Sequence, residues 1–157
     1  IATAASVRSG AYERTLGAMD RAIQVYAKAC PLFVPLVENG RFRPGDAVIE
    51  TVAREYLTPL KETGIDTLML GCTHYPLLME IIGEIMGPEV TLINAGAEAA
   101  RALRGELEAR DMLAQRPQGE TTLYASDSPA DFAALAGQFL CRPIGKDAVG
   151  LVDIERY

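Results

Sequence analysis

The sequence predicts an α/β fold with a mainly parallel sheet that is flanked by helices on both faces. Short apolar runs of strand length alternate along the chain with longer segments in which apolar side chains recur at helical spacing. The joints between them are short and hold glycine, proline, asparagine or a capping hydroxyl. Strands that alternate with helices pair in parallel, because each helix returns the chain to the same end of the sheet.

The clearest strand–helix unit lies in the middle of the chain. Residues 67–70 form an apolar run typical of a strand that is buried on both faces, and we expect Gly71 to allow a sharp turn at its end. Pro76 suits the first turn of a helix, which a stripe of leucine and isoleucine then continues. Residues 72–74 therefore fall between the carboxyl end of a strand and the amino end of a helix.

This position favours a chemical role for Cys72 and His74. Free N–H groups and the positive end of a helix dipole stabilise a thiolate, which makes a cysteine there a better base or nucleophile. His74, two residues later, is placed to hold that charge or to donate a proton, and Thr73 offers a hydroxyl to a ligand oxygen. The alternative is a buried cysteine that behaves as a small hydrophobe beside a surface histidine.

Upstream of this unit the sequence predicts a helix, a strand and an apolar loop. The hydroxyls of Thr3 and Ser6 precede a helical pattern, and capping that helix is their simplest role. Alternation with a period of two predicts a half-buried strand over residues 23–29. Residues 31–38 carry apolar side chains around two prolines, so we expect a loop that lies against the core and brings Glu38 with it. A solvated loop acid is the alternative for Glu38.

The remaining elements continue the alternation of strands and helices, with a polar loop expected over residues 114–121. We expect helices at residues 46–60, 97–112 and 129–140, and strands at residues 90–93, 122–125 and 148–154. Ligands bind outside the carboxyl ends of parallel strands. Since the expected strands end near Thr3, Cys72 and Asn94, a single cleft is expected to collect these side chains.

Composition argues against several classes of protein. The 157 residues are 49% hydrophobic and 23% charged, without an apolar run of 18 residues, which predicts a soluble protein with no membrane partner. The net charge of −6 and the scattered basic residues argue against nucleic acid as a partner. One histidine and three widely spaced cysteines do not suit a zinc site, so no metal is expected. We expect the cysteines to be reduced thiols in a cytoplasm. The motifs of nucleotide-binding loops and serine hydrolases are absent.

Residues 71–78, GCTHYPLL, resemble the second signature of the glutamate racemases. Other segments are similar to that family as well: residues 2–12, 30–38, 92–96 and 132–140. The resemblance implies an enzyme that interconverts L- and D-glutamate for peptidoglycan precursors, without a cofactor, in the cytoplasm and as a homodimer. In this family one cysteine thiolate removes the α-proton of glutamate, and a second cysteine, as a thiol, reprotonates the opposite face.

The resemblance also implies a role for individual residues. Cys72 would be the member of the thiol pair that acts on the L-enantiomer. His74 would be its acid/base partner, and Glu38 would bond to His74 and tune it. Three further side chains would bind the carboxylates and ammonium of the substrate: Thr73, Thr3 and Ser6.

Only part of the family pattern is present in this sequence, so we expect that one lobe of the enzyme is missing from it. The lobe that brings the other base is expected upstream of Ile1, and neither Cys30 nor Cys141 lies in a motif that matches it. Residues 1–93 are therefore expected to form the α/β lobe that carries the second catalytic cysteine, and residues 94–157 to complete the other lobe. The chain by itself is expected to be nearly inactive.

Two other functions stay open at the level of sequence. A nucleophilic hydrolase would use Cys72 and His74 to form a covalent acyl intermediate. A non-catalytic lobe that binds glutamate would keep the cleft without the chemistry. Solvent deuterium at the α-carbon of the substrate distinguishes racemisation from both.

Overall fold

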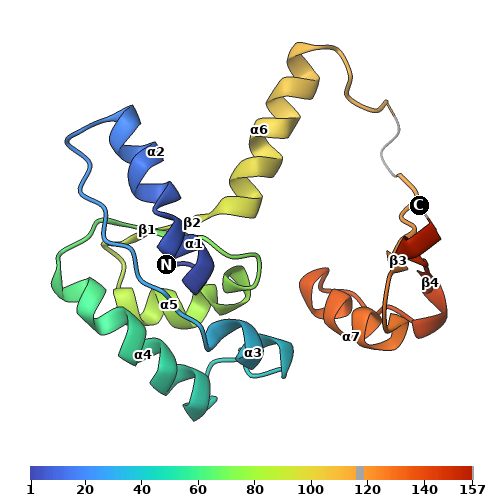
Figure 1. Cartoon of the computed structure of the whole chain (residues 1–157), viewed down its shortest axis with the longest axis horizontal. Helices are drawn as coiled ribbons and strands as arrows, with labels where there is room; N and C mark the ends of the chain where they lie inside the picture. Colours follow the sequence, from blue (N-terminus) through green and yellow to red (C-terminus); the bar gives the residue numbers. More distant parts are fainter. Residues whose placement is uncertain (116–118, 157) are drawn as a thin grey trace. The chain divides into compact units, whose positions relative to one another are not determined.

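The computed structural model describes residues 1–115 and 119–156 and divides them between two compact units (Figure 1). The first unit is Ile1–Asp111 and the second is Met112–Tyr157. This contact boundary lies further along the chain than the expected division at residue 93, which concerned the lobes of a larger protein and stays a prediction. Of the loop expected over residues 114–121, positions 116–118 lie outside the described residues.

The first unit contains most of the secondary structure. Its helices are α1 Ala4–Ser9, α2 Ala11–Met19, α3 Phe33–Glu38, α4 Ala47–Glu62, α5 Met79–Met86 and α6 Ala95–Ala109, with a short 3₁₀ helix, η1, at Tyr75–Leu78. Its strands are β1 Thr67–Leu70 and β2 Thr91–Asn94. In Figure 1, α4 and α5 run side by side below the two strands. None of the helices in the described residues is long and apolar enough to span a bilayer.

Parallel pairing joins the strands of this unit. β1 and β2 are in parallel register, with Thr67 opposite Thr91. Ala2 forms parallel bridges to two segments, at Ala29 on one side and at Gly71 on the other. The extended segments therefore lie in the order β2, β1, Ala2 and Ala29. The predicted α/β fold with parallel strands is confirmed.

The second unit repeats the parallel arrangement on a smaller scale. It contains β3 Leu123–Ala125, α7 Pro129–Phe139 and β4 Val149–Leu151, with 3₁₀ turns at Lys146–Ala148 and Ile154–Arg156. β3 and β4 pair in parallel, and α7 contacts both. The Ser128 hydroxyl caps the amino end of α7, where its oxygen accepts a hydrogen bond from the Asp131 N–H at 3.3 Å, as the Asp-Ser-Pro sequence predicts.

A single apolar core holds α3, α4, β1 and α5 together in the first unit. Phe33 lies near its centre, fully buried, with its ring edge-on to the rings of Tyr56 and Tyr75, each at 5.3 Å between centroids. The fully buried aliphatic side chains around them come from the helices and from β1: Val37, Ile49, Leu57, Leu70, Leu78, Ile81 and Ile82. Aromatic pairs in this geometry contribute beyond the area that they bury.

Three sequence expectations are corrected near the amino end. The expected strand over residues 23–29 is reduced to one bridge at Ala29, since pairing reaches only that residue. The loop expected over residues 31–38 contains a helix, α3, because Pro35 occupies its first turn, where the missing N–H would be unpaired in any case. The helical pattern after the hydroxyls is broken in two by Gly10, whose φ of 61° ends α1 in the left-handed conformation.

The position of Phe33 predicts a large effect of truncation on stability. Phe33→Ala should lower the free energy of unfolding by about 3–5 kcal/mol, because it leaves a cavity among three helices and removes both aromatic contacts. Leu103→Ala, on the exposed surface of α6, is the matched control and should change it by less than about 0.5 kcal/mol. Urea denaturation of the two variants provides the measurement. Equal losses would show that Phe33 is not central to the core.

Candidate active site

The candidate site begins where neighbouring strands end. Because Ala2 and Gly71 are bridge partners, the residues that follow them, Thr3 and Cys72, leave the same edge of the sheet on adjacent segments. Asn94 ends β2 at this edge too, since its partner in the β1 register is Leu70. The strand ends therefore share one edge, as expected, whereas a single cleft that collects the three side chains stays a prediction. The edge carries a thiol, a hydroxyl and a carboxamide.

Cys72, His74 and Glu38 form a continuous line of polar contacts. The Cys72 sulfur lies 3.9 Å from Nδ1 of His74, and Nε2 of His74 lies 3.1 Å from Oε1 of Glu38. The Thr73 hydroxyl lies 3.3 Å from the same Nδ1. Cys72 is half-buried, and the His74 side chain keeps only 18% of its exposure, whereas that of Glu38 keeps 46%. Water therefore reaches the carboxylate end of the line more readily than the imidazole.

The contact with Glu38 sets the tautomer of the imidazole. A carboxylate only accepts hydrogen bonds, so the proton of a neutral His74 ring lies on Nε2. The single lone pair of Nδ1 then faces two possible donors, the Cys72 thiol at 3.9 Å and the Thr73 hydroxyl at 3.3 Å. In this arrangement His74 is placed to take the thiol proton, and Glu38 to stabilise the imidazolium that results.

The apolar side of α3 positions Glu38. Phe33 and Val37 of this helix are fully buried, and Glu38 is its last residue. The sequence expectation that this segment lies against the core and brings Glu38 with it is confirmed. Glu38 reaches His74 across 36 positions of sequence, which makes the contact a tertiary one.

Tyr75 connects the site to the same core. It follows His74 directly, is fully buried, and its hydroxyl donates a hydrogen bond of 3.0 Å to the carbonyl oxygen of Cys30. Burial raises the pKa of this phenol, so it stays a donor. The chain on the carboxyl side of the thiol is therefore anchored to the loop that leads into α3, and the segments that carry Cys72 and Glu38 pack on one core.

The other cysteines have different environments from Cys72. Cys30 is fully buried, and burial raises the pKa of its thiol to about 12, so it stays protonated at neutral pH. Cys141 is exposed in the second unit. All three cysteines are free thiols in the structure. Among the residues that the structure describes, no three side chains of His, Cys, Asp or Glu gather as metal ligands would.

Comparison with known proteins gives this geometry a context. No family model matches the chain. It is 46% identical over 149 residues to the glutamate racemase of Desulforudis audaxviator, covering 90% of this chain and 54% of that protein. It is 41% identical over 148 residues to the glutamate racemase of Geobacter metallireducens, covering 92% and 53%. This chain is a homologue of the glutamate racemases.

Solved glutamate racemases have the same fold over the matched region. The crystal structure from Francisella tularensis in complex with D-glutamate superposes with a TM-score of 0.86 at 31% identity, covering 99% of this chain and 57% of that one. The structure from Thermus thermophilus in complex with β-chloro-D-alanine gives a TM-score of 0.79 at 38% identity, covering 98% and 55%. The chain thus spans about half the length of the glutamate racemases that it matches.

The residues that the glutamate racemase resemblance assigns to substrate are arranged in two groups. Thr73 is exposed beside the imidazole. Thr3 and Ser6 lie together at the start of α1, where the Thr3 oxygen accepts from the Ser6 N–H at 3.4 Å and the two hydroxyls are 3.1 Å apart. Thr3 caps α1 and Ser6 lies in the first turn of that helix, and a role of either in binding substrate stays a prediction. Asn94 also has a capping role, because its oxygen accepts from the Ala97 N–H at 3.2 Å.

Residue 71, just before Cys72, has to be glycine for a different reason from the sharp turn that the sequence predicted. Gly71 is not among the described glycines with positive φ, so it does not serve an unusual turn. A Cβ atom there would lie 2.6 Å from the Tyr12 hydroxyl oxygen and 2.9 Å from the carbonyl oxygen of Ile1. Close approach of α2 and the neighbouring strand segment therefore demands glycine. Sequence reasoning missed Tyr12 because nothing local links it to residue 71.

This crowding predicts the effect of a single methyl group. Gly71→Ala should lower the free energy of unfolding by about 1–3 kcal/mol, since the backbone of Ile1 cannot move without loss of sheet pairing. Adding Tyr12→Phe should recover part of the loss by removing the nearest atom. Gly105→Ala in α6 is the matched control: its Cβ meets nothing within 4 Å, so it should be neutral or stabilising. Chemical denaturation measures all three variants, and a harmless Gly71→Ala would refute the steric argument.

Proposed function

We propose that this chain is the part of a glutamate racemase that holds one of its two thiol bases, Cys72. The reaction is the interconversion of L- and D-glutamate without a cofactor, which supplies D-glutamate to peptidoglycan precursors in the cytoplasm. The observation that supports it most directly is the line from Cys72 through His74 to Glu38 at the carboxyl edge of a parallel sheet. Homology to glutamate racemases supplies the reaction.

The chemistry requires a base that is stronger than a neutral thiol. The α-proton of an amino acid is weakly acidic, so the base must be a thiolate when substrate is bound. His74 generates that thiolate by accepting the Cys72 proton at Nδ1, and Glu38 holds the imidazole by its other nitrogen. The Cys72 thiolate then removes the α-proton of L-glutamate, and in the reverse direction the Cys72 thiol returns a proton to that face.

The proton donor for the opposite face must be a second thiol outside the matched half. Cys30 does not fill that role, because it is fully buried and burial keeps it protonated. Cys141 lies in the other compact unit, without a matching motif. In the two-base mechanism a thiol that is fixed on one face of the substrate cannot protonate the opposite face, so the 157-residue chain alone should not racemise glutamate. Thr73, Thr3 and Ser6 would hold the carboxylates and ammonium of the substrate, in a protein that forms a homodimer.

The role of Cys72 is testable in the complete enzyme. Cys72→Ala should lower turnover of L-glutamate by at least about 10²-fold, the usual contribution of a positioned base. Cys141→Ala should leave turnover largely intact, because that thiol lies in no segment that matches the family pattern. Circular dichroism follows racemisation, and mass spectrometry in deuterium oxide follows solvent deuterium at the α-carbon. Full activity of Cys72→Ala would exclude the proposal, and a trapped acyl intermediate would favour a hydrolase instead.

The role of Glu38 is testable by a change that preserves its shape. Glu38→Gln in the complete enzyme should lower kcat by about tenfold or more and leave KM nearly unchanged, because the carboxamide keeps the contact but not the negative charge that stabilises the imidazolium. Glu55→Gln, an exposed acid of α4, is the matched control for loss of one charge. Steady-state kinetics in both directions give the comparison. Equal kcat values for the two variants would remove Glu38 from the mechanism.

A further inference from the structure

The turn that follows Glu38 has a conformation that suits glycine. Glu38 is the last residue of α3, and Asn39 and Gly40 come directly after it. Gly40 has a φ of 76°, in the left-handed region, where a residue without a Cβ atom carries no steric penalty. Helices commonly end at a glycine in this conformation. The residue that ends α3 is therefore two positions from the carboxylate that contacts His74.

Backbone N–H groups beyond the helix satisfy carbonyl groups of its last turn. The last four carbonyls of an α-helix have no partner within the helix. The Val37 carbonyl accepts a hydrogen bond from the Gly40 N–H at 2.9 Å. The Leu36 carbonyl accepts one from the Arg41 N–H, also at 2.9 Å. This pair of bonds is a Schellman motif, which forms when the residue at the position of Gly40 is left-handed. The motif closes the turn that carries Glu38.

The Asn39 side chain strengthens the same turn. Its Nδ2 donates to the Pro35 carbonyl at 2.7 Å, and its backbone N–H donates to that carbonyl at 3.1 Å. α3 has only six residues, and a helix of this length is not stable by itself. Burial of Phe33 and Val37 holds one face of α3 on the core, and the cap closes the end that carries Glu38.

The place of the Glu38 carboxylate depends on the backbone of this turn. The side chain keeps 46% of its exposure, and its Oε1 lies 3.1 Å from Nε2 of His74. Because so much of the side chain faces solvent, packing restricts it only in part. The backbone of the last turn then sets the point from which the carboxylate reaches the imidazole. Displacement of a positioned group by about 1 Å can lower catalysis steeply.

We propose that Gly40 is a positioning residue of the reaction: by ending α3 in the left-handed conformation, it holds the Glu38 carboxylate against Nε2 of His74. Gly40 has no side chain to contact substrate, so it acts through Glu38. A Cβ atom at this position strains the left-handed conformation, and the last turn of α3 then opens. This inference rests on the proposed function and adds to it the residue that aims the carboxylate.

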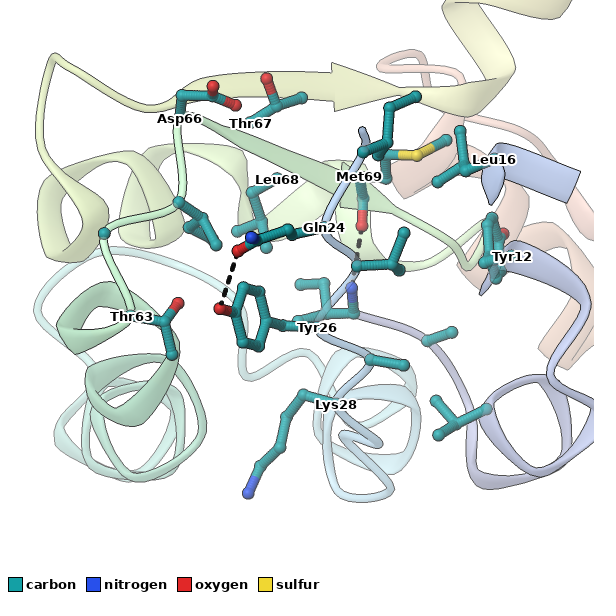
Figure 2. A pocket seen from close by; sticks show the side chains of 18 of the residues that line it. Tyr12, Leu16, Gln24, Tyr26, Lys28, Thr63, Asp66, Thr67, Leu68 and Met69 are labelled. Carbon is teal, nitrogen blue, oxygen red and sulfur yellow. Dashed lines mark hydrogen bonds between the residues drawn. The ribbon is translucent and has the colours of Figure 1, made fainter. Parts of the chain in front are cut away.

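Gly64 provides a matched control at the end of α4. Its φ is 75°, and its N–H donates to the Lys61 carbonyl at 3.0 Å. A Cβ atom would meet nothing within 4 Å at Gly64 or at Gly40. Figure 2 shows Thr63, the residue before Gly64, beside a cavity of about 650 Å³ that none of the three side chains proposed for catalysis lines. The two glycines share a conformation and differ in what their helix ends carry.

Alanine at each glycine tests the proposal in the complete enzyme. Gly40→Ala should lower kcat by about fivefold and leave KM nearly unchanged, because a displaced carboxylate stabilises the imidazolium less well. Gly64→Ala should lower the urea midpoint by a similar amount, since it strains the same conformation, and should leave kcat unchanged. In an enzyme that already carries Glu38→Gln, adding Gly40→Ala should change kcat by less than about twofold, because its effect runs through the carboxylate.

The kcat values of these variants decide the proposal. A loss of kcat that is confined to Gly40→Ala, and that disappears in the enzyme with Glu38→Gln, supports it. Equal kcat values for Gly40→Ala and Gly64→Ala overturn it, as does an undiminished loss in the enzyme with Glu38→Gln. Asparagine adopts the left-handed conformation more readily than alanine, so Gly40→Asn and Gly64→Asn form a milder pair. This pair should show the same difference in kcat, and it replaces the alanine pair if an alanine variant does not fold.

Cys72→Ala tests the proposed function separately from the role of Gly40. If Cys72→Ala is inactive while the two glycine variants have equal kcat values, only the role of Gly40 is wrong. If Cys72→Ala keeps full activity, the proposed function is wrong and the role of Gly40 falls with it.

Discussion

The parallel bridges of Ala2 are the constraint on which the rest of this structure depends. One residue pairs with Gly71 on one side and Ala29 on the other, and so joins β1 to the segment that leads into α3. Because the strands are parallel, their carboxyl ends meet at one edge, where Cys72 emerges. This pairing therefore places the thiol and the segment that leads to Glu38 on neighbouring parts of one sheet.

The apolar core next to this sheet also fixes the orientation of the His74 imidazole. Tyr75 follows His74 directly and Phe33 belongs to the helix that ends at Glu38, and the rings of Tyr75 and Phe33 meet edge to face in the core. The buried hydrogen bond from Tyr75 to the Cys30 carbonyl ties the two sides together. Electrostatic attraction alone stabilises the line of contacts from Cys72 through His74 to Glu38 only slightly, because the carboxylate at its end is half-exposed. Its geometry is held by apolar packing underneath, which keeps a proton acceptor aimed at sulfur.

Cys30 and Cys72 are the same type of residue, but they differ in burial and in the groups that surround their thiols. Cys30 is enclosed by the core, where the charged form of a thiol is penalised, and its pKa rises to about 12. Cys72 stands at the sheet edge, partly open, with an imidazole nitrogen 3.9 Å from its sulfur. The arrangement leaves one thiol inert and gives the other a nearby proton acceptor.

Sequence alone determined the α/β alternation and the end of a strand just before Cys72, because hydrophobic period, proline and capping residues act within a few positions. Tertiary structure alone decided what lies across the fold. Glu38 meets His74 over 36 positions, and Gly71 is required by Tyr12 rather than by a turn. Residues 23–29 have the pattern of a strand yet pair only at Ala29. In each case the reason is the same: a contact between distant segments depends on how the sheet is assembled, which local periodicity does not encode.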